Sequence, residues 1–325
     1  MTNRELLEAI GEIDAGAVLD AREGGMERKV AVRGRRFVSA LVAAVLVVAM
    51  AVSTVAYYGA GDRFKAVFDQ WGGDLSEGQN AFIESAAVDV GESVSKGGYT
   101  ITVASVISDG QTAMIEVSLA APEGQFALGL SFQDFVLSHN GEELNLGWSV
   151  GVVDDGDGKD HTATIILTTV LERSELSFAG DGKWTLCLSD LSMETEEGHL
   201  GDPVAEGDWY FDLTFSQAAD TVELITEPVT FEGRSKNRVP VSARLTSLTL
   251  SAMTVKYTYE FDAEDIQNLA FEDVLVVMKD GSVVHCGSGW GSPGNARYEL
   301  EQPIDLSEVD HVLFADDVKI PMVSE

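Results

Sequence analysis

The densest group of side chains that could do chemistry is a run of carboxylates in the segment DDGDGKD, residues 154–160. Hard cations such as Ca²⁺ prefer oxygen ligands, and carboxylates this close together can supply several of them. The order of an EF-hand loop is absent, because glycine does not hold the sixth position and no glutamate closes the loop. The segment is therefore either a solvated hairpin tip, which we favour, or a weak calcium site. The candidate ligands are Asp154, Asp155, Asp157 and Asp160.

Other residue types that serve catalysis are present without the required arrangement. The five histidines are scattered, and none has a partner at the spacing of a metal site. The segment GWGSPG, residues 289–294, has the letters of a dinucleotide-binding loop, but such a loop must open a helix, and Pro293 and the strand-like residues after it oppose that. Without a nucleophile, base and orienting group in a recognisable set, we expect a non-enzymatic protein with no cofactor.

The two cysteines, Cys187 and Cys286, are too few for a disulfide-rich scaffold or a four-thiolate zinc site. They fall in different predicted domains, and a disulfide needs Cα atoms within about 7 Å of each other. We therefore expect two free thiols.

The charge balance is strongly acidic, with 21 Lys and Arg against 54 Asp and Glu and a formal net charge of −33. Nucleic acid is excluded as a partner, because phosphate binding needs a clustered cationic face. Residues 1–36 contain seven basic and seven acidic residues, so the whole excess lies later in the chain. Because the acids are dispersed, we interpret them first as a solubility feature, with binding of a cation or basic ligand as the alternative.

Residues 37–58 form an uncharged apolar run that is roughly 33 Å long as a helix, enough to cross a bilayer core of about 30 Å. A cleaved signal peptide is the alternative, but the run is longer than a signal core and 36 residues precede it. Basic residues cluster immediately before the run, so the N-terminus is predicted inside the cell and most of the chain outside. The expected location is the plasma membrane, as a single-pass protein.

The predicted cytoplasmic segment, residues 1–36, contains a short amphipathic helix. Leu6, Ile10 and Ile13 recur at helical spacing, with Leu7 beside them. A segment this short cannot build its own core. Its apolar stripe, Leu6, Leu7, Ile10 and Ile13, therefore docks on a partner helix, lies on the membrane, or belongs to a disordered or frayed segment that only precedes the basic cluster.

The rest of the chain has three predicted parts. Residues 59–87 form a stalk, in which Phe64, Val67, Phe68 and Trp71 recur at helical spacing. From Val88 the apolar pattern changes to period two, with Gly- and Asp-rich turns such as Ser108-Asp109-Gly110. The pattern predicts a mainly β ectodomain of two tandem β-sandwiches, residues 88–217 and 218–325.

Several stretches carry a resemblance to a bacterial family. LLEAIGEID, the arginine-flanked span and GYTITVASVISDG resemble single-pass membrane proteins with an uncharacterised ectodomain, often encoded beside extracytoplasmic-function sigma factors. VSARLTSLTLSAMTVKYTYE, VVMKDGSVV and PIDLSEVDHVLFADDVKIPM resemble the immunoglobulin-like module of some members. The resemblance implies tandem immunoglobulin-like β-sandwiches outside the membrane and an anti-sigma-like role.

One motif of a well-known class of anti-sigma proteins is missing. The chain lacks the His-x3-Cys-x2-Cys zinc motif and has no cysteine before Cys187, which excludes that fold. The expected function is thus regulation of a sigma factor, which residues 1–36 would contact in the cytoplasm. The ligand outside the cell is unknown. The alternative is a membrane-anchored adhesion or envelope-structure binding module.

Overall fold

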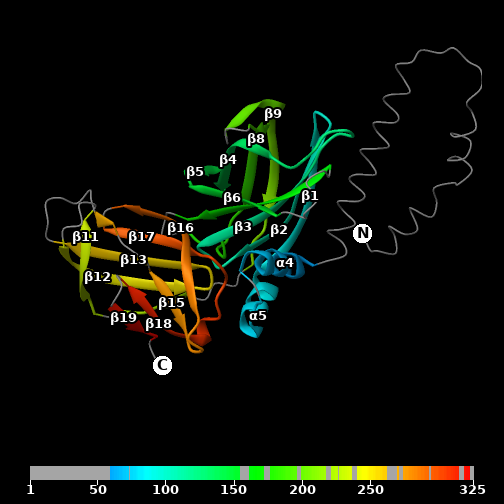
Figure 1. Cartoon of the computed structure of the whole chain (residues 1–325). Helices are drawn as coiled ribbons and strands as arrows, with labels where there is room; N and C mark the ends of the chain where they lie inside the picture. The colour runs from blue at the N-terminus through cyan, green and yellow to red at the C-terminus, as the bar shows by residue number, and fades with distance from the viewer. Residues whose placement is uncertain are drawn as a thin grey trace, which may run out of the picture. The chain divides into compact units, whose positions relative to one another are not determined.

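The computed structural model describes most of the chain after the predicted span (Figure 1). The described residues are 59–72, 74–153, 161–171, 176–195, 199–216, 221–225, 227–235, 240–261, 269–270, 274–292, 294–314 and 318–322. Among them no helix has the length and apolar character needed to cross a bilayer, and residues 37–58 lie outside this set. The predicted span and orientation stay predictions.

Two α-helices open the described region. Helix α4 spans Ala60–Gly72 and helix α5 spans Glu77–Ala86. The helical spacing read from the sequence is confirmed in α4, which buries Phe64 and Phe68. Helix α5 begins with a capping box, in which the Ser76 hydroxyl accepts from the Gln79 N–H at 3.2 Å and the Gln79 side chain accepts from the Ser76 N–H at 2.7 Å.

Two antiparallel sheets form the first β unit, defined here as strands β1 to β9. One sheet has the order β1-β2-β3-β7-β6 and the other β5-β4-β8-β9. Apolar residues of both sheets, among them Ile101, Val117, Phe132 and Trp209, belong to one buried core. The strands are β1 Ala87–Lys96, β2 Tyr99–Ser108, β3 Thr112–Ala120, β4 Leu130–His139, β5 Glu142–Leu144, β6 Trp148–Val153, β7 Thr162–Val170, β8 Trp184–Glu194 and β9 Leu200–Leu213.

The second β unit, strands β10 to β19, is a ten-stranded sheet that folds over its own core. The ring of Phe314 on β18 lies 4.9 Å from that of Phe231 on β11 and 4.8 Å from that of Tyr257 on β13, which joins distant strands. The strands are β10 Thr221–Glu223, β11 Val229–Ser235, β12 Pro240–Ser251, β13 Thr254–Phe261, β14 Leu269–Ala270, β15 Leu275–Met278, β16 Val283–Ser292, β17 Asn295–Leu300, β18 Val309–Phe314 and β19 Val318–Pro321. A short 3₁₀ helix, η2 Leu306–Glu308, precedes β18.

The mainly β class predicted from the period-two pattern is confirmed, and the described strands form several sheets. The hairpin predicted at Ser108-Asp109-Gly110 is also confirmed, since β2 pairs with β3 across that turn. The period-two runs Val239–Leu250 and Met253–Phe261 of the sequence correspond to β12 and β13, which pair as a second hairpin around residues 252 and 253.

Helix α4 is fixed to the first β unit by a nearly buried ion pair and by apolar packing. The Arg63 Nε donates to Glu116 Oε2 at 2.8 Å, and the Ser105 hydroxyl donates to the same oxygen. Arg63 also donates through Nη2 to Asp89 Oδ1 at 2.8 Å. A small core of its own, including Phe64, Phe68, Ile83, Ile107, Met114, Ile166 and Met253, joins both helices to both β units.

The two β units meet turn to turn around one carboxylate. Asp109, 1% exposed, lies in the β2–β3 turn, and its Oδ1 accepts from the N–H groups of Gln111 at 2.9 Å and Thr112 at 2.8 Å. Its Oδ2 accepts from three groups of the β12–β13 turn. They are the Ser251 hydroxyl at 2.5 Å, the Met253 N–H at 2.9 Å and the Thr254 hydroxyl at 2.9 Å. We call these residues the Asp109 joint.

The joint contains one further hydrogen bond between the units. The hydroxyls of Thr112 and Thr254 are 2.6 Å apart. Because the Thr254 hydroxyl proton is donated to Asp109, the Thr112 hydroxyl must be the donor to Thr254. All of these side chains are buried, so the carboxylate is held by protein donors in place of water.

Replacing Asp109 with alanine should destabilise the protein strongly. Asp109→Ala leaves two donors of the β2–β3 turn and three of the β12–β13 turn without their acceptor, and we expect the free energy of unfolding to fall by about 3 kcal/mol or more. Thermal and denaturant unfolding of the full chain, followed by circular dichroism, measures this. Asp202→Ala, at an exposed position of β9, is the matched control and should change stability by less than about 0.5 kcal/mol. Equal effects of the two substitutions would contradict the assigned role of Asp109.

Candidate ligand-binding cleft

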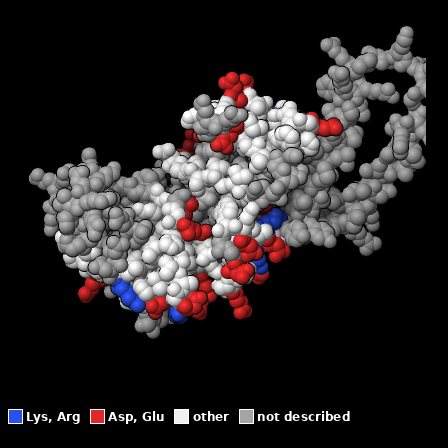
Figure 2. Space-filling model, viewed as in Figure 1, with Lys and Arg blue, Asp and Glu red and all other residues white. Residues whose placement is uncertain are grey.

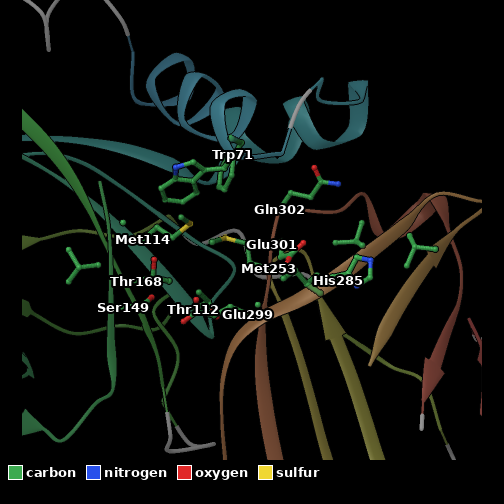
Figure 3. A pocket seen from close by; sticks show the side chains of 17 residues that line it. Trp71, Thr112, Met114, Ser149, Thr168, Met253, His285, Glu299, Glu301 and Gln302 are labelled. Atoms are coloured by element: carbon green, nitrogen blue, oxygen red, sulfur yellow. The ribbon is translucent and has the colours of Figure 1, made fainter. Parts of the chain in front are cut away.

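A cleft of about 630 Å³ lies where α4 and the two β units come together (Figure 3). Helix α4 contributes Phe68 and Trp71 to its wall. The first β unit contributes Thr112, Met114, Ser149, Val150, Gly151 and Thr168, and the second contributes Met253, Val283, Val284, His285, Gly287, Glu299, Leu300, Glu301 and Gln302. Two of these residues, Thr112 and Met253, also belong to the Asp109 joint, so the joint forms part of the cleft wall.

One side of the cleft is aromatic and rich in sulfur. Trp71, at the C-terminal end of α4, is 41% exposed although it is large and apolar. Its indole rests on Gly151 of β6, since a Cβ built on that glycine would lie 2.8 Å from Trp71 Cζ2. In the view of Figure 3, Met114 and Met253 lie between the indole and the opposite, acidic wall.

The opposite side of the cleft carries carboxylates. Glu299, on β17, and Glu301, just after that strand, both line it, and His285 of β16 lies near them in the wall. Burial raises the pKa of the Glu299 carboxyl to about 7, and neither a hydrogen-bond donor nor a neighbouring charge contributes to this rise. No lysine or arginine of the described residues lines the cleft.

A second cleft, of about 830 Å³, lies between the N-terminal end of α5 and the β15–β16 hairpin. This region holds α5 against the second β unit, because the Gln79 side chain donates to the Pro303 carbonyl at 2.5 Å. Gly78 approaches Asp305 so closely that a Cβ would lie 1.7 Å from Oδ2. The described residues that line this second cleft include no aromatic side chain, so the first cleft has more of the features of a ligand site.

The surface outside the clefts is acidic but shows no single acidic centre. On the face shown in Figure 2, Asp and Glu recur at separate places over both β units, and Lys and Arg are few. Within the described parts of the chain, no group of three or more His, Cys, Asp or Glu is arranged to hold a metal ion. This dispersed pattern fits the solubility interpretation of the net charge.

The residues predicted as sites from the sequence lie outside the described residues. This holds for the carboxylate run Asp154–Asp160 and for the apolar stripe Leu6, Leu7, Ile10 and Ile13, so both stay predictions. Cys187 lies on β8 and Cys286 on β16, and no disulfide joins them, in agreement with the sequence-based prediction. Residues 289–292 of the glycine-rich segment form the end of β16 and pair with β17, so they do not open a helix, as expected.

Sequence reasoning missed the cleft itself. The helical spacing marks Trp71 only as one of the apolar residues of a stalk helix, and the sequence assigns no role to Glu299. The signal for Trp71 was its place at the end of the stripe, beside Gly72. No local signal existed for Glu299, because its burial depends on elements that lie far away in the sequence.

Comparison with known proteins does not assign the chain to a family. No protein-family model matches it, and no curated protein matches it. Among solved structures, it is similar to the conserved domain protein from Bacillus anthracis, with a TM-score of 0.47 and 16% identity over 70% of this chain and 75% of that one. A weaker similarity is to S. aureus TarS, with a TM-score of 0.19 and 12% identity over 68% of this chain and 39% of that one. Neither similarity carries an argument about function.

The raised pKa of Glu299 predicts a pH-dependent effect of Glu299→Gln on stability. Between its ordinary pKa of 4.5 and about 7, the folded state retains a proton that the unfolded state has lost, so this residue lowers stability as pH rises through that range. Glutamine cannot ionise. The variant should therefore gain about 1–2 kcal/mol relative to the native chain between pH 5 and pH 8, after allowance for solvent screening.

Unfolding midpoints of both proteins at several pH values provide the measurement. The neighbouring charged residues Glu301 and Arg297 and the neighbouring His285 are present in both chains, so their contributions cancel in the difference. Glu123→Gln, which removes a charge from an exposed turn, controls for the change in net charge. A difference between variant and native chain that stays constant with pH would show that Glu299 is not buried as described.

Proposed function

We propose that the chain is a non-enzymatic, single-pass membrane protein that regulates an extracytoplasmic-function sigma factor. In this proposal the two β units act outside the cell as tandem immunoglobulin-like β-sandwiches. Residues 37–58 cross the plasma membrane, and residues 1–36 contact the sigma factor in the cytoplasm. The cleft between α4 and the β units is the site at which an extracytoplasmic signal is received.

The observation that supports this proposal most strongly is the position of helix α4. The helix begins at Ala60, immediately after the predicted span, and its first turns are attached to the first β unit by Arg63 and Phe64. Its last turn places Trp71 in the cleft wall. One short helix therefore connects the predicted membrane span to the candidate site.

This connection supplies a physical route for a signal. An occupant of the cleft would contact α4 and both β units together, and would favour whichever arrangement of the three it binds best. Because the Arg63–Glu116 ion pair and the Phe64 and Phe68 packing hold α4 to its sheet, such a change would move the helix as a rigid element. The span would carry that movement to residues 1–36, where the apolar stripe holds or releases the sigma factor.

The topology predicts the behaviour of a fusion placed after Glu325. A reporter that is active only in the cytoplasm should be silent there, because the basic cluster ahead of Phe37 keeps the N-terminus inside. The same reporter fused before Met1 serves as the positive control. Activity of the C-terminal fusion would reverse the orientation and remove the basis for a cytoplasmic partner at the N-terminus.

The partner prediction concerns Ile10 in the apolar stripe. Burial of an Ile side chain is worth about 1.5–3 kcal/mol, so Ile10→Asp should weaken capture of a sigma factor by roughly tenfold to a hundredfold. Capture by the full chain from its native cell, with the sigma factor identified by mass spectrometry, measures this. Glu12→Gln, which lies off the stripe, should leave capture unchanged.

The same experiment separates this function from its alternatives. A segment that lies on lipid would bind liposomes and capture no sigma factor. A native chain that captures none, in a cell whose sigma-dependent transcription is indifferent to Ile10→Asp, would support the anchored adhesion module instead.

A further inference from the structure

The size of the cleft restricts its occupant to a small molecule. Its volume of about 630 Å³ falls inside the range of roughly 300–1,000 Å³ that is usual for small-molecule sites. Its walls come from α4 and from both β units, so a molecule inside it is contacted from several sides. This arrangement differs from a flat surface patch, which suits a protein partner.

The charge of the cleft favours a cation. Glu299 and Glu301 line it, and no described lysine or arginine does. No described side chain donates a hydrogen bond to the Glu299 carboxylate, although burial removes much of its contact with water. Glu299 is half-buried, so its carboxylate is partly desolvated, and a bound cation would offset the cost of that desolvation.

The remaining lining favours an organic cation over a metal ion. Trp71 presents an exposed indole, a large flat apolar surface against which an aromatic or other flat group can pack. Met114 and Met253 add polarizable surface that adapts to flat apolar groups. A bare metal ion would use the carboxylates alone and leave this apolar wall without a partner, and no metal-like cluster occurs among the described residues.

We propose that this cleft binds a small organic cation, an ammonium or guanidinium group attached to a flat apolar group. The Glu299 carboxylate pairs with the charge, and Glu301 adds to the negative potential at the rim. The indole of Trp71 covers the apolar part, and the methionine side chains Met114 and Met253 form the surface between the two ends. The inference names the ligand class of the sensor, and it rests on the proposed function only for the role of the ligand in signalling.

The methionine methyl groups provide a direct test in the full chain. The protein is labelled with ¹³C at the methionine methyls and titrated in detergent micelles with phenethylamine, an aromatic ammonium. We expect the Met114 and Met253 signals to shift in a saturable way. Met193, which packs against the core of the first β unit away from the cleft lining, is the internal control and should not move.

Two further probes with the same phenyl group and a different charge test the electrostatic part of the proposal. 2-Phenylethanol, which is neutral, should bind at least tenfold more weakly than phenethylamine. 3-Phenylpropionate, which is an anion, should cause no saturable shift. Equal affinity of the amine and the alcohol, or the absence of a saturable shift with the amine, would overturn the proposal.

Two variants test the assigned residues. Glu299→Gln should weaken phenethylamine binding by about tenfold and make its affinity similar to that of 2-phenylethanol. Glu123→Gln, in an exposed turn, should leave both affinities unchanged. Gly151→Ala, which displaces the indole without changing any charge, should weaken both probes to a similar extent. An unaltered affinity in Glu299→Gln, with the methionine spectrum of the folded protein retained, would contradict the proposal.

The outcome is distinguishable from that of the proposed function. The titration measures binding in the cleft, whereas sigma-factor capture measures the cytoplasmic segment. If the chain binds the amine and captures no sigma factor, the proposed ligand class stands and the proposed regulatory function is wrong. If the chain captures a sigma factor and does not bind the amine, the regulatory function stands and the proposed ligand class is wrong.

Discussion

The structure depends on one buried carboxylate that two turns share. Each β unit has its own apolar core, so neither needs the other in order to bury its hydrophobic residues. The orientation of one β unit against the other is set by the Asp109 joint. Its carboxylate accepts two hydrogen bonds from its own turn and three from the turn of the second unit. Buried hydrogen bonds are directional, and they therefore specify one orientation where apolar contact alone would allow several.

The cleft and helix α4 follow from that orientation. Thr112 and Met253 belong both to the joint and to the cleft wall, and Met253 also packs in the small core that holds α4 and α5. A change in the joint would therefore alter the cleft and the seat of α4 together. The Arg63–Glu116 ion pair and the Gln79–Pro303 hydrogen bond attach the helices to the first and second units separately.

The sequence could predict the local elements and could not predict what they build together. The β2–β3 hairpin followed from alternation and from a Ser-Asp-Gly turn, and α4 followed from the spacing of Phe64 and Phe68. The role of Asp109 could not be predicted, because an aspartate is common in turns for local reasons and its partner turn begins more than a hundred residues later. The position of Glu299 in the cleft wall could not be predicted either, because the other walls of the cleft come from α4 and the first β unit, which lie far away in the sequence. The carboxylate run Asp154–Asp160, interpreted as a hairpin tip with a weak calcium site as the alternative, and the apolar stripe near the N-terminus lie outside the described residues and remain predictions.

The central claim is that the two β units behave as one body because of the Asp109 joint, and amide hydrogen exchange tests it most directly. The N–H group of Met253 donates to Asp109 across the joint, and that of Val117 lies within the first core. If the joint opens only when the protein unfolds, both amides exchange with similar slow rates in the native chain. Rapid exchange of Met253 while Val117 stays protected would show that the units separate locally, and would contradict the account.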